Sequence, residues 1–212
     1  MGRVKNRIAE LREAGPKGAA RLVFRKAIYR NVQMARYEIR AGDSTGPGSD
    51  PGLSIELLGP EEFDSVLGSS PYLTADHLRD FRRQRSTCIV ALDGNLIAAS
   101  SWMTSGNVYV HELQRHVDVP SGEHLSCRTY VDDEYRGRAL MQHLIHAYAT
   151  TCQPQDLIWG LIHSWNTASI RSVERLGWRQ TGRYWSRYVF GRQFAGEQHF
   201  PPRSATSPPS PT

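Results

Sequence analysis

The sequence lacks several features that mark membrane-embedded, secreted or disulfide-bonded proteins. None of its apolar runs approaches the roughly 18 consecutive residues that a transmembrane helix needs. The N-terminus has no apolar segment of the signal-peptide type, so export by that route is not expected. The three cysteines are far apart and odd in number, which argues against a disulfide framework and a closed zinc site. These absences predict a cytoplasmic protein.

Lysine is also scarce, and positive charge is concentrated at the N-terminus. Residues 1–40 carry eleven Lys and Arg against three Glu, a net charge of +8, whereas the whole chain carries +5. Apolar residues at mostly helical spacing predict a basic helical extension over this segment. Such a helix could contact the inner membrane as a peripheral anchor. The alternative is a helix docked on the body or in a homodimer contact.

Two other segments contain few large apolar residues. Residues 41–52 are rich in Gly, Pro, Ser and Asp, which predicts a flexible linker. Residues 197–212 are rich in Pro and Ser, which predicts a disordered tail. Residues 53–196 are therefore expected to form one folded domain.

The expected domain alternates between strands and helices. Strands are predicted at residues 53–58, 87–92, 96–102, 125–131, 157–162 and 184–190. Helices are predicted from residue 60, and over residues 74–83, 137–150 and 166–176. Asp93-Gly94-Asn95 indicates a hairpin turn. In the strand at 125–131, Leu125, Cys127, Thr129 and Val131 are expected on one face. The strand–helix–strand order in the second half predicts a parallel pair in a mixed sheet.

The junction between the strand at 125–131 and the following helix is rich in charge and contains a glycine. It reads Tyr-Val-Asp-Asp-Glu-Tyr-Arg-Gly-Arg-Ala-Leu-Met over residues 130–141. A tight strand-to-helix turn leaves the first helical N–H groups free to bind an anion. Gly137 permits close approach of a phosphate, and Arg136 and Arg138 add positive charge. Taken alone, this loop fits either an anion site or an ordinary strand-to-helix turn with two solvated arginines.

Two later motifs add to this junction. Asn166-x-x-Ser169 opens the next helix, and Val-Glu-Arg-Leu-Gly-Trp follows over residues 173–178. Together with the junction, they resemble the GNAT superfamily of acyl-CoA N-acyltransferases, whose central helix opens with Arg/Gln-x-x-Gly-x-Gly/Ala. Here Arg136 matches, whereas Ala139 and Met141 stand at the glycine positions. The resemblance implies an α+β fold in which a mixed, mostly antiparallel sheet has a splayed central parallel pair and flanking helices.

The resemblance also implies acetyl-CoA as co-substrate and places its contacts. The strand end would pair with the pantetheine arm, the junction would hold the pyrophosphate, and the next helix would contact either group. The implied contact residues are Tyr130, Val131, Arg136, Gly137, Arg138, Ala139, Leu140, Met141, Asn166 and Ser169. The methyl group of Ala139 is compatible with this role if the backbone there is helical.

The catalytic groups are less sharply indicated. Members of the superfamily transfer the acyl group directly to an amine, which must lose a proton to a base. The candidate bases are Glu123 first, then Glu112 and His124. The tyrosine that often protonates the thiolate in the superfamily is replaced by Val173. The candidate substitutes are Tyr184, Tyr188, Cys127 and water. No metal is expected.

These observations predict an N-acetyltransferase acting on the amine of a small molecule, such as an amino sugar or a cell-envelope precursor. Two alternatives stay open. One is a catalytically silent CoA-binding domain with a regulatory or scaffold role, and the other is a membrane or assembly module that acts through the N-terminal helix. No nucleic-acid-reading motif is present, so a nucleic acid is not an expected partner. The acceptor is expected to contact loops at residues 68–73 and 106–124.

Overall fold

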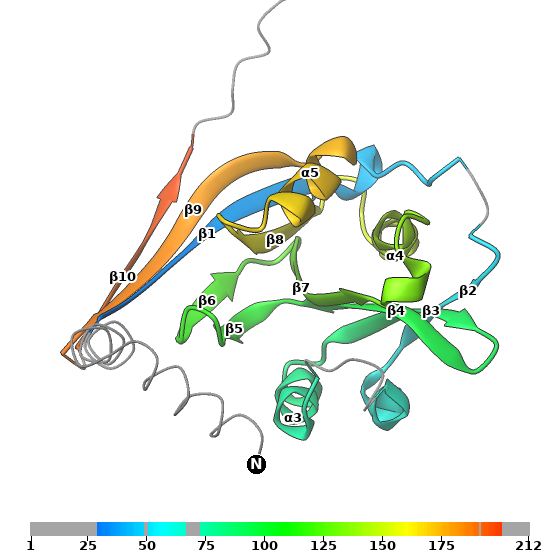
Figure 1. Ribbon diagram of the computed structural model, residues 1–212, viewed down its shortest axis with the longest axis horizontal. Helices are drawn as coiled ribbons and strands as arrows, with labels where there is room; N and C mark the ends of the chain where they lie inside the picture. The colour runs from blue at the N-terminus through cyan, green and yellow to red at the C-terminus, as the bar shows by residue number, and fades with distance from the viewer. Residues whose placement is uncertain (1–28, 49–50, 67–72, 191, 201–212) are drawn as a thin grey trace, which may run out of the picture.

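The computed structural model describes residues 29–48, 51–66, 73–190 and 192–200. Among these residues, eight strands form one sheet in the order β10-β9-β1-β8-β7-β4-β3-β2, and β5 and β6 form a second sheet (Figure 1). The strands are β1 (Tyr29–Arg40), β2 (Ser54–Leu58), β3 (Thr87–Asp93), β4 (Leu96–Thr104), β5 (Gly106–Val110), β6 (Arg115–Val119), β7 (Glu123–Val131), β8 (Leu157–His163), β9 (Arg179–Val189) and β10 (Arg192–His199). The helices are α3 (Ala75–Arg83), α4 (Leu140–Ala149) and α5 (Thr167–Arg175), with 3-10 turns η2 (Ala41–Asp43), η3 (Pro60–Val66) and η4 (Asp133–Tyr135). The predicted α+β class is confirmed.

The strand β1 lies in the middle of the large sheet, although it precedes all the others in the chain. It pairs antiparallel with β8 on one side and with β9 on the other. The helix predicted over residues 1–40 is therefore wrong over Tyr29–Arg40, and residues 1–28 lie outside the described part. Val32 packs into one hydrophobic cluster and Tyr37 into another. A strand covered on both faces is apolar at many positions, and such a run imitates helical spacing.

The strands β2, β3 and β4 form an antiparallel meander, of which the sequence predicts the three strands and the hairpin between β3 and β4. Gly94 joins β3 to β4 with a φ of +57°, a conformation that suits glycine. Thr74 caps α3 in a capping box: its hydroxyl accepts from the backbone N–H of His77, while the His77 ring accepts from that of Thr74. Local signals of this kind placed these elements correctly.

The parallel pair β7 and β8 is joined at one end and open at the other. Pairing runs from Glu123 opposite Leu157 to Ser126 opposite Gly160 and then stops. This confirms the predicted splay. The strict alternation predicted for residues 125–131 is wrong, because β7 bulges against β4 where Arg128 adopts a left-handed φ of 50°. Leu125 and Val131 consequently pack into different clusters.

Helices cover both faces of the large sheet (Figure 1). Leu144 of α4 and Val173 of α5 share a cluster on one side, which we call the α4 face. The turn η3 and helix α3 pack around Trp102 on the other side, which we call the α3 face. The β5–β6 hairpin lies on this second face and packs against β1 and β8. It occupies most of the segment that was predicted as an acceptor loop.

The limits of the folded body differ from those predicted. The sheet includes β1, and β10 runs to His199, so the tail predicted from residue 197 begins too early; residues 201–212 lie outside the described part. The described residues of the expected linker make contacts: the Ala41 N–H donates to Asp156 O at 2.9 Å, and the Ser44 carbonyl lies 3.0 Å from His146 Nδ1.

No helix in the described part of the chain is both long and apolar enough to cross a bilayer.

Candidate acetyl-transfer site

A cavity of about 340 Å³ connects the two faces of the sheet where β7 and β8 part. Its described lining on the α4 face comprises Met141, Ile145, Asn166, Ser169, Val173 and Trp178. At the crossing, the lining residues belong to β7 (126–130) and β8 (160–163). On the α3 face, the lining is led by Leu73, His77, Asp80, Phe81, Gln84 and residues 108–112. A molecule entering from either face can therefore reach the gap between the strands.

The crossing point offers backbone groups on two facing strand edges. Beyond Ser126 and Gly160, the two strands make no ladder hydrogen bonds to each other. Such edges can pair with an extended ligand as a further strand would. Gly160 lines the passage without a side chain. A Cβ there would lie 3.4 Å from the Ser126 carbonyl oxygen and 3.7 Å from Trp178, and would take up space between the strands. An extended, hydrogen-bonding chain fits this gap.

The loop before α4, on the α4 face, has the geometry that the sequence predicts for an anion site. Gly137 has a φ of +83° and Ala139 a φ of +54°, and the helix begins at Leu140. The first N–H groups of a helix have no partner within it and lie at the positive end of its dipole. Exposed Arg136 and Arg138 add positive charge. A Cβ at Gly137 would meet nothing within 4 Å, so a ligand can approach this backbone.

Two expectations about this loop are corrected. The helix predicted from residue 137 begins at Leu140. Ala139 is left-handed rather than helical, with φ 54° and ψ 24°. Sequence reasoning misses this because alanine rarely adopts a left-handed backbone, so nothing in its identity signals the turn.

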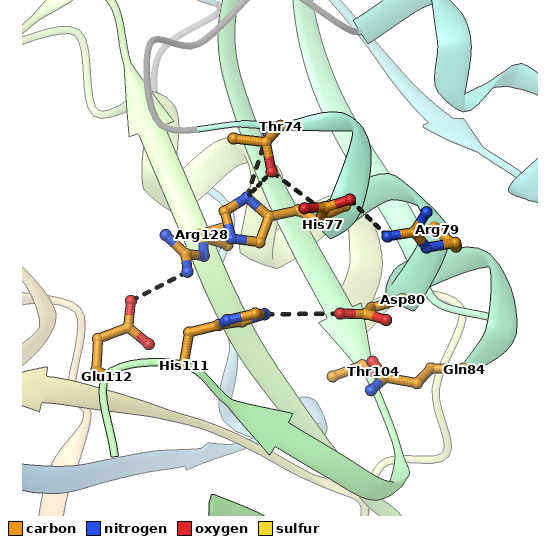
Figure 2. Close-up of polar contacts among 10 residues, drawn as sticks. Thr74, His77, Arg79, Asp80, Gln84, Thr104, His111, Glu112 and Arg128 are labelled. Atoms are coloured by element: carbon orange, nitrogen blue, oxygen red, sulfur yellow. Dashed lines mark hydrogen bonds and ion pairs between the residues drawn. The ribbon is translucent and has the colours of Figure 1, made fainter. Parts of the chain in front are cut away.

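The α3 face carries the carboxylates and the guanidinium of the cavity (Figure 2). Arg128 of β7 reaches Glu112, with Nη2 3.3 Å from Oε1. His111, beside Glu112, faces helix α3, with Nε2 3.6 Å from Oδ2 of Asp80. The ring of His77 meets that of His111 edge-on at 4.8 Å between centroids. This end therefore brings together two carboxylates, a guanidinium and two imidazoles.

His77 is tied into this group and into the start of α3. Its Nδ1 accepts from the Thr74 backbone N–H at 3.2 Å, which requires an unprotonated Nδ1. Burial lowers the pKa of His77, and the charges of Arg128 and His111 lower it further. The neutral ring is thus favoured by both its hydrogen bond and its surroundings.

Residues 55–178 match the acetyltransferase (GNAT) family. The match spans more than half of the chain, and the splayed strands and the loop before α4 lie within it. The chain belongs to the GNAT acetyltransferase family.

Solved structures support the same fold for this GNAT chain. A functionally unknown conserved protein from Staphylococcus epidermidis aligns with TM-score 0.56 and 10% identity, over 78% of this chain and 65% of its own. A GCN5-related N-acetyltransferase from Sphaerobacter thermophilus aligns with TM-score 0.50 and 15% identity, over 81% of this chain and 56% of its own. A tandem GNAT protein from the clavulanic acid biosynthesis pathway aligns with TM-score 0.50 and 18% identity, over 85% of this chain and 58% of its own. This chain thus covers less than two thirds of each. No curated protein matches it.

The donor residues predicted from the GNAT motifs fall into two groups. Tyr130, Met141, Asn166 and Ser169 line the cavity. The others are not among its described lining residues: Val131, Arg136, Gly137, Arg138, Ala139 and Leu140 form the strand end and the loop beside it. The Leu140 side chain is buried in the core, so only its backbone can meet a ligand. Asn166 Oδ1 accepts from the Ser169 N–H at 3.2 Å, which caps α5 as expected.

The predicted catalytic residues of the GNAT chain lie elsewhere, since none of the three is among the described lining residues. Glu123 accepts a hydrogen bond from buried Arg36 at 2.9 Å. Tyr184 is buried, and burial raises its pKa. The Tyr188 hydroxyl donates to the Leu113 carbonyl at 3.2 Å.

The lower-ranked candidates divide differently. Glu112 lines the cavity, whereas His124 does not appear in its described lining and lies 3.1 Å from the Tyr148 hydroxyl. Cys127 lines the crossing, but burial raises the pKa of its thiol to about 12, which makes it a poor proton donor to a departing thiolate.

Sequence reasoning missed four residues of the polar end: His77, Asp80, His111 and Arg128. His77 and Asp80 are three residues apart on α3 and so share a helical face, which was the available signal. Nothing local could pair that face with His111, which follows a hairpin strand that the sequence did not reveal.

Proposed function

We propose that this protein transfers an acetyl group from acetyl-CoA directly to the amine of a small molecule. The observation that carries the proposal is one cavity that runs from Met141 and Asn166, beside the loop before α4, through the gap between β7 and β8 to the polar groups on the α3 face. Two substrates can meet at the gap in the sheet, so no acyl-enzyme intermediate is needed.

Acetyl-CoA, the donor, would bind from the α4 face with its pyrophosphate at the start of α4 and its thioester toward the gap in the sheet. The pyrophosphate would bind the first N–H groups of α4, aided by Arg136. The pantetheine arm would extend through the gap beside Tyr130, with Asn166 and Ser169 on its other side. The thioester would then reach the crossing, where the bulge at Arg128 turns the strand.

The acceptor enters from the α3 face, and Glu112 serves as the base. Its carboxylate takes a proton from the amine, directly or through a water. The amine nitrogen forms its bond to the acetyl carbon as the carbon–sulfur bond breaks, and the thiolate takes a proton from water. Arg128 holds Glu112 toward the crossing through their 3.3 Å contact.

An amino sugar or cell-envelope precursor as acceptor, a cytoplasmic location, a membrane contact and a homodimer stay predictions from the sequence. The silent CoA-binding alternative differs in one result: it would bind acetyl-CoA and acetylate no amine.

The first test is donor binding, measured as thermal stability against acetyl-CoA, longer acyl-CoAs and ADP. A ligand at about 100 times its Kd raises the free energy of unfolding by about 2.7 kcal/mol. We expect saturable stabilisation by acetyl-CoA that weakens in Arg136→Ala. No stabilisation by any CoA would refute the donor site.

The second test compares Glu112→Gln with Glu123→Gln in an acetylation assay. We expect Glu112→Gln to lower kcat by about 100-fold or more, with acetyl-CoA affinity within about twofold. Glu123→Gln should mainly lower Tm, because buried Arg36 then loses one of its two carboxylate partners and keeps only Glu38. The reverse pattern would make Glu123 the base.

A further inference from the structure

At the acceptor end of the cavity the walls are apolar, whereas the rim carries polar groups. Six of its apolar lining residues come from the two hydrophobic clusters of the α3 face: Met34, Phe81, Trp102, Val108, Val110 and Leu125. Phe81 stacks on Trp102 at 4.2 Å between ring centroids, and Phe63 meets Trp102 edge-on at 4.6 Å. These contacts hold one wall as a rigid aromatic surface.

The charges at this end are few and already engaged. The described lining residues include two carboxylates, Asp80 and Glu112, and one arginine, Arg128. Glu112 faces Arg128 at 3.3 Å and Asp80 faces His111 at 3.6 Å. A ligand with several ammonium groups would need a carboxylate for each one as it lost its water. These lining residues supply no such surplus of negative charge.

We propose that the acceptor is a monoamine carried on an apolar or aromatic body, and not a polycation such as a polyamine or aminoglycoside. The single amine would lie between Glu112 and the crossing, and its body would lie on the Phe81 and Trp102 wall. This inference rests on the proposed function and narrows its acceptor.

Tyr109 provides a place to test the charge argument. It lines the cavity and is 36% exposed, so a substitution there does not open the core. Tyr109→Asp adds a carboxylate with no assigned partner to the acceptor end. Leu96→Asp makes a comparable change at a residue 68% exposed on the β3–β4 hairpin, outside the described lining.

The experiment measures kcat/KM for 2-phenylethylamine, tryptamine, glucosamine, spermidine and kanamycin, with the acetylated product identified by mass spectrometry. We expect an aromatic monoamine to exceed spermidine and kanamycin by about 100-fold, and glucosamine by about 10-fold. Tyr109→Asp should reduce the monoamine-to-spermidine ratio by about 10-fold, and Leu96→Asp should leave it unchanged.

Each outcome separates this inference from the proposed function. If acetyl-CoA does not stabilise the protein, the proposed function fails and the acceptor class fails with it. If acetyl-CoA binds but spermidine, kanamycin or glucosamine is preferred to the aromatic monoamines, the acceptor class alone is overturned. If acetyl-CoA binds and none of the five amines is acetylated, the acceptor class is overturned and the silent CoA-binding alternative is favoured. An unchanged ratio in Tyr109→Asp would refute the charge argument.

Discussion

At the scale of single residues, the loop before α4 has an alanine at a left-handed position where a glycine would be less strained. A left-handed backbone costs a non-glycine residue roughly 1–2 kcal/mol, whereas glycine costs roughly 0.5–1 kcal/mol in lost freedom. Ala139 has a φ of 54° and lies beside the amides that we propose bind the pyrophosphate. Its strain therefore bears on both stability and donor binding.

We predict that Ala139→Gly raises the free energy of unfolding by about 0.5–1 kcal/mol. Acetyl-CoA affinity should be kept or tightened, because the loop geometry is retained without strain. Gly137→Ala is the matched opposite, since it places a Cβ on a φ of +83° with no neighbour within 4 Å. It should destabilise through the backbone alone. Thermal unfolding and calorimetric titration measure both effects; a lower Tm or weaker binding in Ala139→Gly would contradict this account.

At the scale of elements, sequence signals succeeded where the information was local. The cap at Thr74, the turn at Gly94 and the stop at Gly177 each depend on residues within a few positions. The strand β1 and the β5–β6 hairpin failed because their identity depends on distant partners. The candidate site divides in the same way: the proposed donor loop is one continuous motif, whereas the proposed acceptor end joins α3, β7 and the β5–β6 turn.

The cap of α3 makes this helix sensitive to acid. The pKa of His77 is lowered in the fold, so the unfolded chain takes up the proton first as pH falls below about 6.5. The free energy of unfolding should then fall, since protonated Nδ1 cannot accept from the Thr74 N–H. Above that pH the contribution is fully present.

We predict that His77→Gln reduces this acid-induced loss, because glutamine at the same position completes the capping box without titrating. Urea unfolding between pH 7.5 and 5.0 measures the effect. Exposed His116→Gln is the control and should retain the native pH dependence. If the free energy of unfolding fell equally with pH in His77→Gln and in the native protein, His77 would not be the cause of the acid-induced loss.

At the scale of the whole molecule, strand β1 links the two parts of the large sheet. Among the described strands it separates β8 from β9, so β9 and β10 are hydrogen-bonded to the rest of the large sheet through β1 alone. Val32, Met34, Tyr37 and Ile39 of this strand are all at most 9% exposed. Burying such side chains contributes about 1.5–3 kcal/mol each, on the order of 10 kcal/mol together. That is comparable with the whole stability of a typical domain.

We therefore predict that a chain beginning at residue 41 does not fold cooperatively, whereas one beginning at residue 29 does. Circular dichroism melting and size-exclusion chromatography of the two truncations isolate what β1 contributes. A cooperative transition of the shorter chain near the Tm of the longer one would show that β1 is dispensable. The result also decides how membrane contact must be tested. Vesicle binding should be compared between the full chain and the one that begins at residue 29, because losing β1 would confuse unfolding with lost membrane affinity.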